Sequence, residues 1–136
     1  MCIKEKSRLR FKVKSCHDAE ISLMTNDKLS DTYLTIAFGN QNNTLTYIYK
    51  PDHGGETMVS TSINQKLLNC NNFKDFWIEW DNQRLTFGEN SSELLKTITG
   101  AISVQFRYLT VATSKNATGN WVIQLDDQPS GTAKLH

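Results

Sequence analysis

The chain has 136 residues, of which 38% are hydrophobic and 21% charged, which is typical of one folded domain with its own core. Its 15 Lys and Arg residues nearly balance 14 Asp and Glu residues, so the total charge does not favour a nucleic-acid partner. No apolar run approaches the roughly 18 residues that span a bilayer, so we expect no membrane insertion.

We expect a single domain over residues 1–136, with the core in about 8–126 and a flexible C-terminal tail over 127–136. The first residues lack the apolar segment of a signal peptide, so we expect none within this sequence. A cytoplasmic protein and a mature secreted chain both have this property, so secreted or extracellular and cytoplasmic locations stay open. Three Asn-x-Ser/Thr sequons, which begin at residues 42, 90 and 116, favour secretion.

Apolar residues that alternate with polar ones predict a series of short strands. In chain order these cover residues 9–14, 17–24, 32–38, 45–49, 58–63, 76–80, 85–87, 101–114 and 120–126. Pro51 predicts that the fourth strand stops before it, because proline lacks the N–H of a central strand. Residues 90–93 resemble a helix capping box, but the periodic segment behind it is short for a helix, because Gly100 follows quickly.

The densest apolar stretch is the hairpin at residues 73–88. Phe76, Ile78 and Trp80 share one face of its first strand. Trp77 faces the other way, which predicts a second layer over that face or a Trp side chain available to a partner. Because buried Trp is the commoner case, we favour the covered face.

Short strands, regular turn signals and the lack of a long helix predict an all-β fold. An antiparallel two-sheet β-sandwich of jelly-roll type fits these strand lengths best, and an up-and-down barrel is the alternative.

The three cysteines fit neither a metal site nor a dense disulfide scaffold. In an oxidising compartment Cys16 and Cys70 could pair and leave Cys2 for an intermolecular bridge. In a reducing compartment all three would be ordinary small apolar residues.

Three loops, at residues 39–43, 52–56 and 115–121, concentrate amides, hydroxyls and acids. Such groups bind sugar hydroxyls when an aromatic ring covers the C–H face of the sugar. Trp121 is a candidate for that ring, although a core position that caps one end of the sandwich is the favoured interpretation. Asp52 and Glu56 could ligate a calcium ion. The candidate ligand-binding residues are Asn40, Asn42, Asp52, His53, Glu56, Asn120 and Trp121.

Catalytic motifs are absent from the sequence. No Gly-x-Ser-x-Gly occurs, and none of the seven glycines forms the Gly-x-Gly of a nucleotide-binding turn. We therefore expect a non-catalytic protein.

Several blocks of the chain resemble one known family over about residues 9–125. The most specific is Phe76-Trp77-Ile78 with Trp80, preceded by Cys70, and Gly119-Asn-Trp121 is a weaker match. These blocks resemble the farnesoic acid O-methyltransferase-like domain family. The family name implies methyl transfer to a terpenoid acid. Its members look like small β-sandwich modules of invertebrate extracellular or defence proteins, and some resemble galactose-binding lectins.

The leading hypothesis from these observations is a lectin for terminal galactose that binds glycans or glycoproteins. A homodimer, joined through Cys2, would compensate for the weak affinity of one shallow site. The alternatives are the methyltransferase that the family name implies, and an adhesion module in which the sheet face of Trp77 meets another protein.

Overall fold

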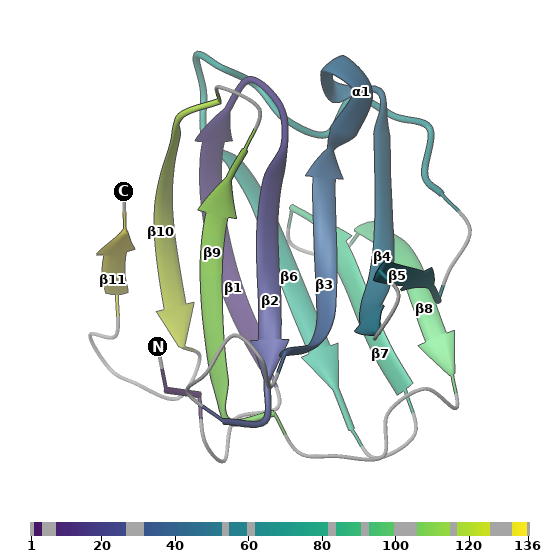
Figure 1. The fold of residues 1–136 in the computed structure, drawn as a ribbon. Helices are drawn as coiled ribbons and strands as arrows, with labels where there is room; N and C mark the ends of the chain where they lie inside the picture. The colour runs from purple at the N-terminus through teal and green to yellow at the C-terminus, as the bar shows by residue number, and fades with distance from the viewer. Residues whose placement is uncertain are drawn as a thin grey trace.

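A computed structural model describes residues 2–3, 8–26, 32–52, 55–59, 62–81, 84–90, 93–99, 106–114, 117–125 and 132–135. The described chain is almost entirely β-structure, in two antiparallel sheets that pack face to face (Figure 1). The predicted all-β sandwich of jelly-roll type is confirmed. The strands are β1 (Arg8–Ser15), β2 (Ala19–Met24), β3 (Thr32–Gly39), β4 (Leu45–Asp52), β5 (Gly55–Met58), β6 (Lys74–Trp80), β7 (Arg84–Glu89), β8 (Glu93–Thr99), β9 (Tyr108–Thr113), β10 (Gly119–Leu125) and β11 (Thr132–Leu135).

The six-stranded sheet has the order β11-β10-β1-β6-β7-β8, and the five-stranded sheet has the order β5-β4-β3-β2-β9. Every pairing within them is antiparallel. The chain passes from one sheet to the other between β1 and β2, between β5 and β6, between β8 and β9, and between β9 and β10. Strands distant in sequence, such as β1 and β10, therefore lie side by side.

The core lies between the sheets and is built from alternate residues of each strand. Phe11 of β1 is at its centre, with ring centroids 5.9 Å from Phe38, 5.6 Å from Phe76 and 5.8 Å from Trp121. Phe76 and Phe38, which belong to different sheets, are 4.7 Å apart. These aromatic contacts hold the two layers together.

The capping-box pattern after Asn90 does not begin a helix in the structure. Residues 93–99 form β8, an edge strand that pairs with β7. Ile98 is buried and Leu95 packs on the core, whereas Leu94 is 57% exposed. Thr97, Ile98 and Thr99 are β-branched, and with an open strand edge beside them a strand buries more apolar surface than a short helix would.

The ends of other strands also differ from the expectation. β4 continues through Pro51. Among the described residues Pro51 pairs with Glu56 of β5 and with no residue of β3, so no second neighbouring strand requires the N–H that proline lacks. The tail expected to be frayed contributes β11, which pairs with β10. The strand expected over 58–63 differs from the one observed, because β5 ends at Met58 and Ile63 makes an isolated bridge with Thr46. Part of the strand expected over 101–114 lies outside the described residues, and its described part is β9.

Candidate functional site

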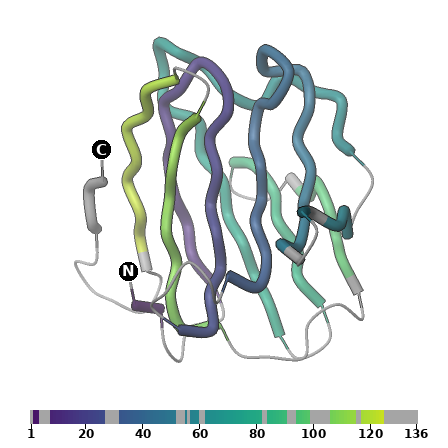
Figure 2. Tube along the Cα trace, viewed as in Figure 1, coloured from purple at the N-terminus to yellow at the C-terminus, as the bar shows by residue number. Residues whose placement is uncertain are grey.

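The polar loops that the sequence singled out lie at different ends of the sandwich. α1 (Asn40–Asn43) lies at the end where β1 meets β2 (Figure 2). Gly119 pairs with Ser15 at the last position of β1, so Asn120 also lies near that end. β4 then carries the chain about 25 Å away before it reaches Asp52. The structure therefore does not bring the predicted ligand residues into one site.

Trp121 does not form the sugar-stacking platform considered from the sequence. Its side chain is 2% exposed and lies in the core against Phe11. Trp121 alternates in phase with Ile123, which is fully buried, so this face of β10 points between the sheets. Its role is packing, and the flanking polar residues of its loop gave a misleading signal.

The calcium hypothesis depends on the side chains of Asp52 and Glu56, which the structure does not describe. His53 also lies outside the described residues. The backbone pairs Asp52 with Gly55 and Pro51 with Glu56, so residues 52 and 56 are not cross-strand partners. Among the described residues, no three His, Cys, Asp or Glu side chains cluster closely enough to hold a metal ion.

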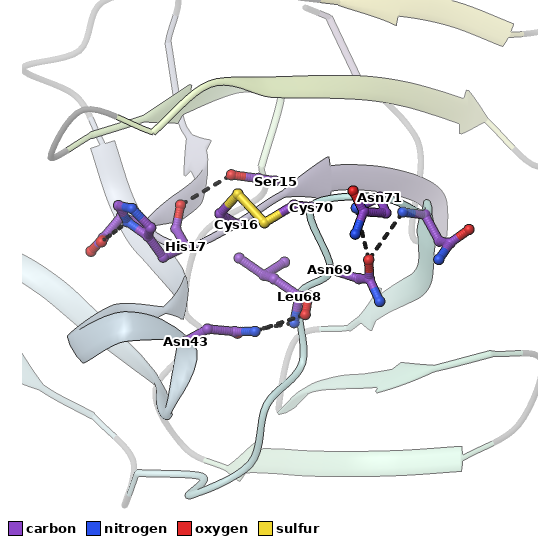
Figure 3. Close-up of a disulfide and its surroundings, with 10 residues drawn as sticks. Ser15, Cys16, His17, Asn43, Leu68, Asn69, Cys70 and Asn71 are labelled. Atoms are coloured by element: carbon purple, nitrogen blue, oxygen red, sulfur yellow. Dashed lines mark hydrogen bonds and ion pairs between the residues drawn. A yellow bond between two sulfur atoms is a disulfide. The ribbon is translucent and has the colours of Figure 1, made fainter.

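The loop with Asn40 and Asn42 has a structural role that the sequence did not indicate. Gln41, Asn42 and Asn43 all have positive φ, between 51° and 63°, so the turn is left-handed. The Asn43 amide donates to the Leu68 carbonyl oxygen at 2.7 Å and accepts from the Leu68 N–H at 3.0 Å (Figure 3). Asn43 thereby attaches the turn to the segment before β6.

A disulfide joins Cys16 to Cys70 beside this attachment (Figure 3). It is the pairing that the sequence left open, and it links the β1–β2 turn to the segment that enters β6. Cys2 is exposed and is the free cysteine of the described chain. An intermolecular bridge through Cys2 stays a prediction.

His17 and Asp18 form a structural pair next to the disulfide. His17 Nδ1 lies 2.5 Å from Asp18 Oδ2, and Asp18 is 3% exposed. The backbone of Asp18 bonds to Gly39 and to Ser114, so it ties three turns together at this end of the sandwich. The two residues thus form a polar pair at the start of β2.

Trp77 lies on the outer face of the six-stranded sheet, and the strands β1, β6, β7 and β8 of this sheet lie behind the other sheet in Figure 1. The covered face expected for it is not what the structure shows. Trp77 is half-buried, and on the same face Arg10 and Asp75 are exposed. Among the described residues, no further layer lies over this sheet. Its indole N–H is buried among neighbouring side chains without an acceptor in the described chain.

The strand register places the neighbours of Trp77 in one row across the sheet. Arg10 of β1 is opposite Trp77, Gly88 of β7 is on the other side, and Leu94 of β8 follows Gly88. Gly88 has no side chain and is nevertheless buried, so side chains of its neighbours cover it. Trp77 and the exposed Leu94 thus form an apolar strip on this face.

Two shallow hollows lie on this face, on either side of the Trp77 row. The first, of about 190 Å³, is lined by residues of β10, β1 and β6, among them Lys12, Asp75 and Gln124. The second, of about 210 Å³, is lined by Arg8, Glu79, Thr86 and neighbouring residues. Asp75 and Glu79 are two residues before and after Trp77, so the indole stands between the two hollows.

Each hollow contains an acid–base pair. Arg8 Nη1 lies 3.0 Å from Glu79 Oε1, and Lys12 Nζ lies 3.7 Å from Asp75 Oδ1. All four side chains are substantially exposed, so each pair stabilises the fold by about 1 kcal/mol or less. We call this outer face of β10, β1, β6, β7 and β8 the Trp77 face. It offers carboxylates, cations, amides and an aromatic ring within one surface.

The sequence pattern placed Trp77 out of phase with Phe76 and Ile78, but it did not indicate that the basic residues of β1 lie beside Trp77. Arg10 is adjacent to Trp77 in space and 67 positions away in the chain, and only the β1–β6 register joins them. The signal that pointed to the face was alternation: Arg8, Arg10 and Lys12 occupy the polar positions of β1.

The model of the family described as "Farnesoic acid 0-methyl transferase" matches residues 2–126. The chain belongs to this family. The match includes the Phe76–Trp80 block and all five strands of the Trp77 face, so the resemblance read from the sequence is confirmed. No curated protein matches this farnesoic acid methyltransferase-family chain in sequence.

Solved structures with a similar fold include sheep galectin-11 in complex with glycerol, at a TM-score of 0.55 and 4% identity. That likeness covers 88% of this family member and 94% of the galectin. A lichenase, a prokaryotic β-1,3-1,4-glucanase from a mouse hindgut metagenome, has a TM-score of 0.57 and 9% identity over 87% of this chain and 64% of its own. A native glycosidic hydrolase has a TM-score of 0.55 and 14% identity over 82% and 53%.

These likenesses concern the fold. The chain spans between about half and two thirds of the length of the two hydrolases. Within the described residues, no helix has both the length and the apolar composition needed to cross a membrane.

Proposed function

We propose that the protein is a non-catalytic carbohydrate-binding module whose ligand lies on the Trp77 face. The observation that carries the proposal is the position of Trp77 between two hollows that each hold an acid–base pair. Sugars combine an apolar C–H face with vicinal hydroxyls, and this surface offers a complement to both. The galectin and the two hydrolases with this fold support the proposal as analogy.

In this arrangement one sugar ring stacks on the indole of Trp77, with Leu94 at its edge. Hydroxyls of the same or the next sugar donate to Asp75 or Glu79 and accept from Lys12 or Gln124. Terminal galactose, which the family resemblance implies, is the first sugar to test.

A glycan array followed by calorimetric titration tests the proposal, with Trp77→Ala as the diagnostic variant. Tyr47→Ala is the matched control, because Tyr47 is a half-buried aromatic residue on the outer face of the other sheet. We expect Trp77→Ala to weaken binding at least about tenfold, since stacking on an aromatic ring contributes about 1 kcal/mol or more. Tyr47→Ala should leave binding unchanged. Binding lost in Tyr47→Ala and kept in Trp77→Ala would move the site to the other sheet.

Calcium is tested in the same titration by adding a chelator. Loss of binding that calcium restores would assign a metal role to Asp52 and Glu56. Unchanged binding would leave the Trp77 face sufficient by itself.

Methyl transfer is the second candidate, and the family description supports it. It predicts that a labelled S-adenosylmethionine donor and farnesoic acid give the methyl ester, and that donor binding produces measurable heat. Neither product nor heat would eliminate it. The described chain holds one helix, the four-residue α1, so a donor would have to bind without the strand-to-helix turn common in methyl-donor and nucleotide sites.

The Cys16–Cys70 disulfide supports a secreted or extracellular location, since such bonds persist in oxidising compartments. A homodimer would raise the avidity of a weak site. Sedimentation of the purified chain, with and without reductant, measures whether Cys2 joins two copies. Self-association that Trp77→Ala abolishes would favour the adhesion alternative.

A further inference from the structure

The Trp77 face carries a row of cations along β1. Arg8, Arg10, Lys12 and Lys14 occupy alternate positions of the strand and all face outward. Alternate residues of a strand are about 7 Å apart, so the four side chains extend along about 20 Å. Lys14 ends the row, with its Nζ 5.0 Å from the centre of the Phe73 ring.

The positive charge of this face is local. The whole chain has a formal net charge of +1, so the sequence total gives no sign of it. Among the described side chains of the face, basic residues outnumber acidic ones, with Arg8, Arg10, Lys12, Lys14 and Arg84 against Asp75, Glu79 and Asp81. Clustered charge of one sign attracts ligands of the opposite sign over about 10 Å.

The acid–base pairs of the face can exchange partners at small cost. Both pairs are exposed and contribute little to stability. The described row of Trp77 contains no acidic residue. Arg10 and then Gln124 follow on one side, and Gly88 and Leu94 follow on the other. A guanidinium next to an indole can hold a planar or tetrahedral oxyanion while the attached sugar ring covers the indole.

We propose that the ligand class of the Trp77 face is an anionic oligosaccharide, which carries sulfate or carboxylate groups and lies along β1. This inference rests on the proposed carbohydrate-binding function and specifies its substrate. Trp77 stacks on one sugar ring, Arg10 and Lys12 bind the oxyanions, and Asp75 and Glu79 accept hydrogen bonds from hydroxyls. The length of the cation row fits several sugars in sequence.

The test compares three oligosaccharides with one galactose-based backbone: neutral, sulfated, and oxidised to carry uronic carboxylates. Titrations are run at low and high salt. At low salt we expect the anionic forms to bind about tenfold or more tightly than the neutral form, and we expect added salt to reduce that advantage. The sulfated and carboxylated arms distinguish the two kinds of oxyanion.

Two variants separate the charge contribution from folding. Arg10→Gln should weaken binding of the anionic forms about three- to tenfold and change binding of the neutral form less than about twofold. Glu79→Gln keeps an acceptor oxygen for the hydroxyls but removes a negative charge and the ion pair with Arg8, so it should strengthen binding of the anionic forms. Arg107→Gln, an exposed Arg at the start of β9 in the other sheet, makes the same charge change as Arg10→Gln and should have no effect.

The possible outcomes are distinct. Binding to no saccharide would overturn the proposed function and this inference together. Neutral and anionic forms that bind equally well, or an Arg10→Gln variant that weakens both alike, would overturn the inference and leave the carbohydrate-binding function intact. Single-stranded DNA that binds as tightly as the sulfated oligosaccharide would show a general polyanion surface and would also overturn it.

Discussion

Trp77 of β6 and Gly88 of β7 are direct partners in the antiparallel ladder, on the outer face of the six-stranded sheet. A residue without a side chain lets the neighbouring indole lie close to the sheet. The large apolar ring is therefore held half-buried, with part of it accessible. A ring in that position can both stabilise the sheet and bind a ligand.

The two tryptophans of opposite faces should differ in their contribution to stability. We expect Trp121→Ala to lower the free energy of unfolding by about 3–5 kcal/mol, because it empties a core position. Trp77→Ala should lower it by about 1–2 kcal/mol, since the side chain is half-buried. Urea denaturation of both variants measures the difference. Equal losses would contradict the assignment of Trp77 to an open face.

Asn43 should be important for stability although it lies in a polar turn. Asn43→Ala removes two hydrogen bonds to Leu68 and puts alanine at a φ of 63°, so we expect a loss of about 2–3 kcal/mol. Asn43→Gly loses the same hydrogen bonds but tolerates the positive φ, and should be about 1 kcal/mol less damaging. The midpoints of urea unfolding rank the three proteins. An alanine variant as stable as the glycine variant would argue against the left-handed turn.

Gly39 should not tolerate a side chain. A Cβ at this position would lie 2.6 Å from Leu68 Cδ1 and 2.9 Å from Asn43 Oδ1, at a φ of 68°. We expect Gly39→Ala to cost about 2–4 kcal/mol from the left-handed conformation and the clash. Shortening Leu68 removes part of the clash, so the double variant Gly39→Ala/Leu68→Ala should be about 1 kcal/mol more stable than the two single losses predict. Strict additivity in this cycle would mean that the clash with Leu68 is not the cause.

Reduction of the Cys16–Cys70 disulfide should destabilise the protein. The two cysteines are 54 positions apart, and release of a loop of that size lowers the free energy of unfolding by about 2–4 kcal/mol. Both cysteines are exposed, so a reductant can reach them in the folded protein. Thermal melts with and without dithiothreitol measure the shift. The double variant Cys16→Ser/Cys70→Ser should start at the lower stability and show no response to the reductant.

Local patterns were enough to predict most of the strands. The alternation of Leu9, Phe11 and Val13, and that of Phe76, Ile78 and Trp80, identified β1 and β6, because the period of two is a property of each strand alone. β8 was missed for the converse reason. Its capping-box pattern is a local helix signal, and the open edge of β7 that made it a strand lies outside the segment itself.

The sequence by itself determined the all-β class, the two-layer sandwich and the family, since these depend on strand period, turn chemistry and a contiguous aromatic block. Tertiary structure decided which tryptophan is accessible. Trp77 stands between Phe76 and Ile78 in the chain and Trp121 follows Gly119 and Asn120, yet the packing of the sheets sends the first outward and the second into the core. It also decided the candidate site, because the β1–β6 register brings Arg10 beside Trp77. Strand pairing between distant segments leaves no local trace in the sequence.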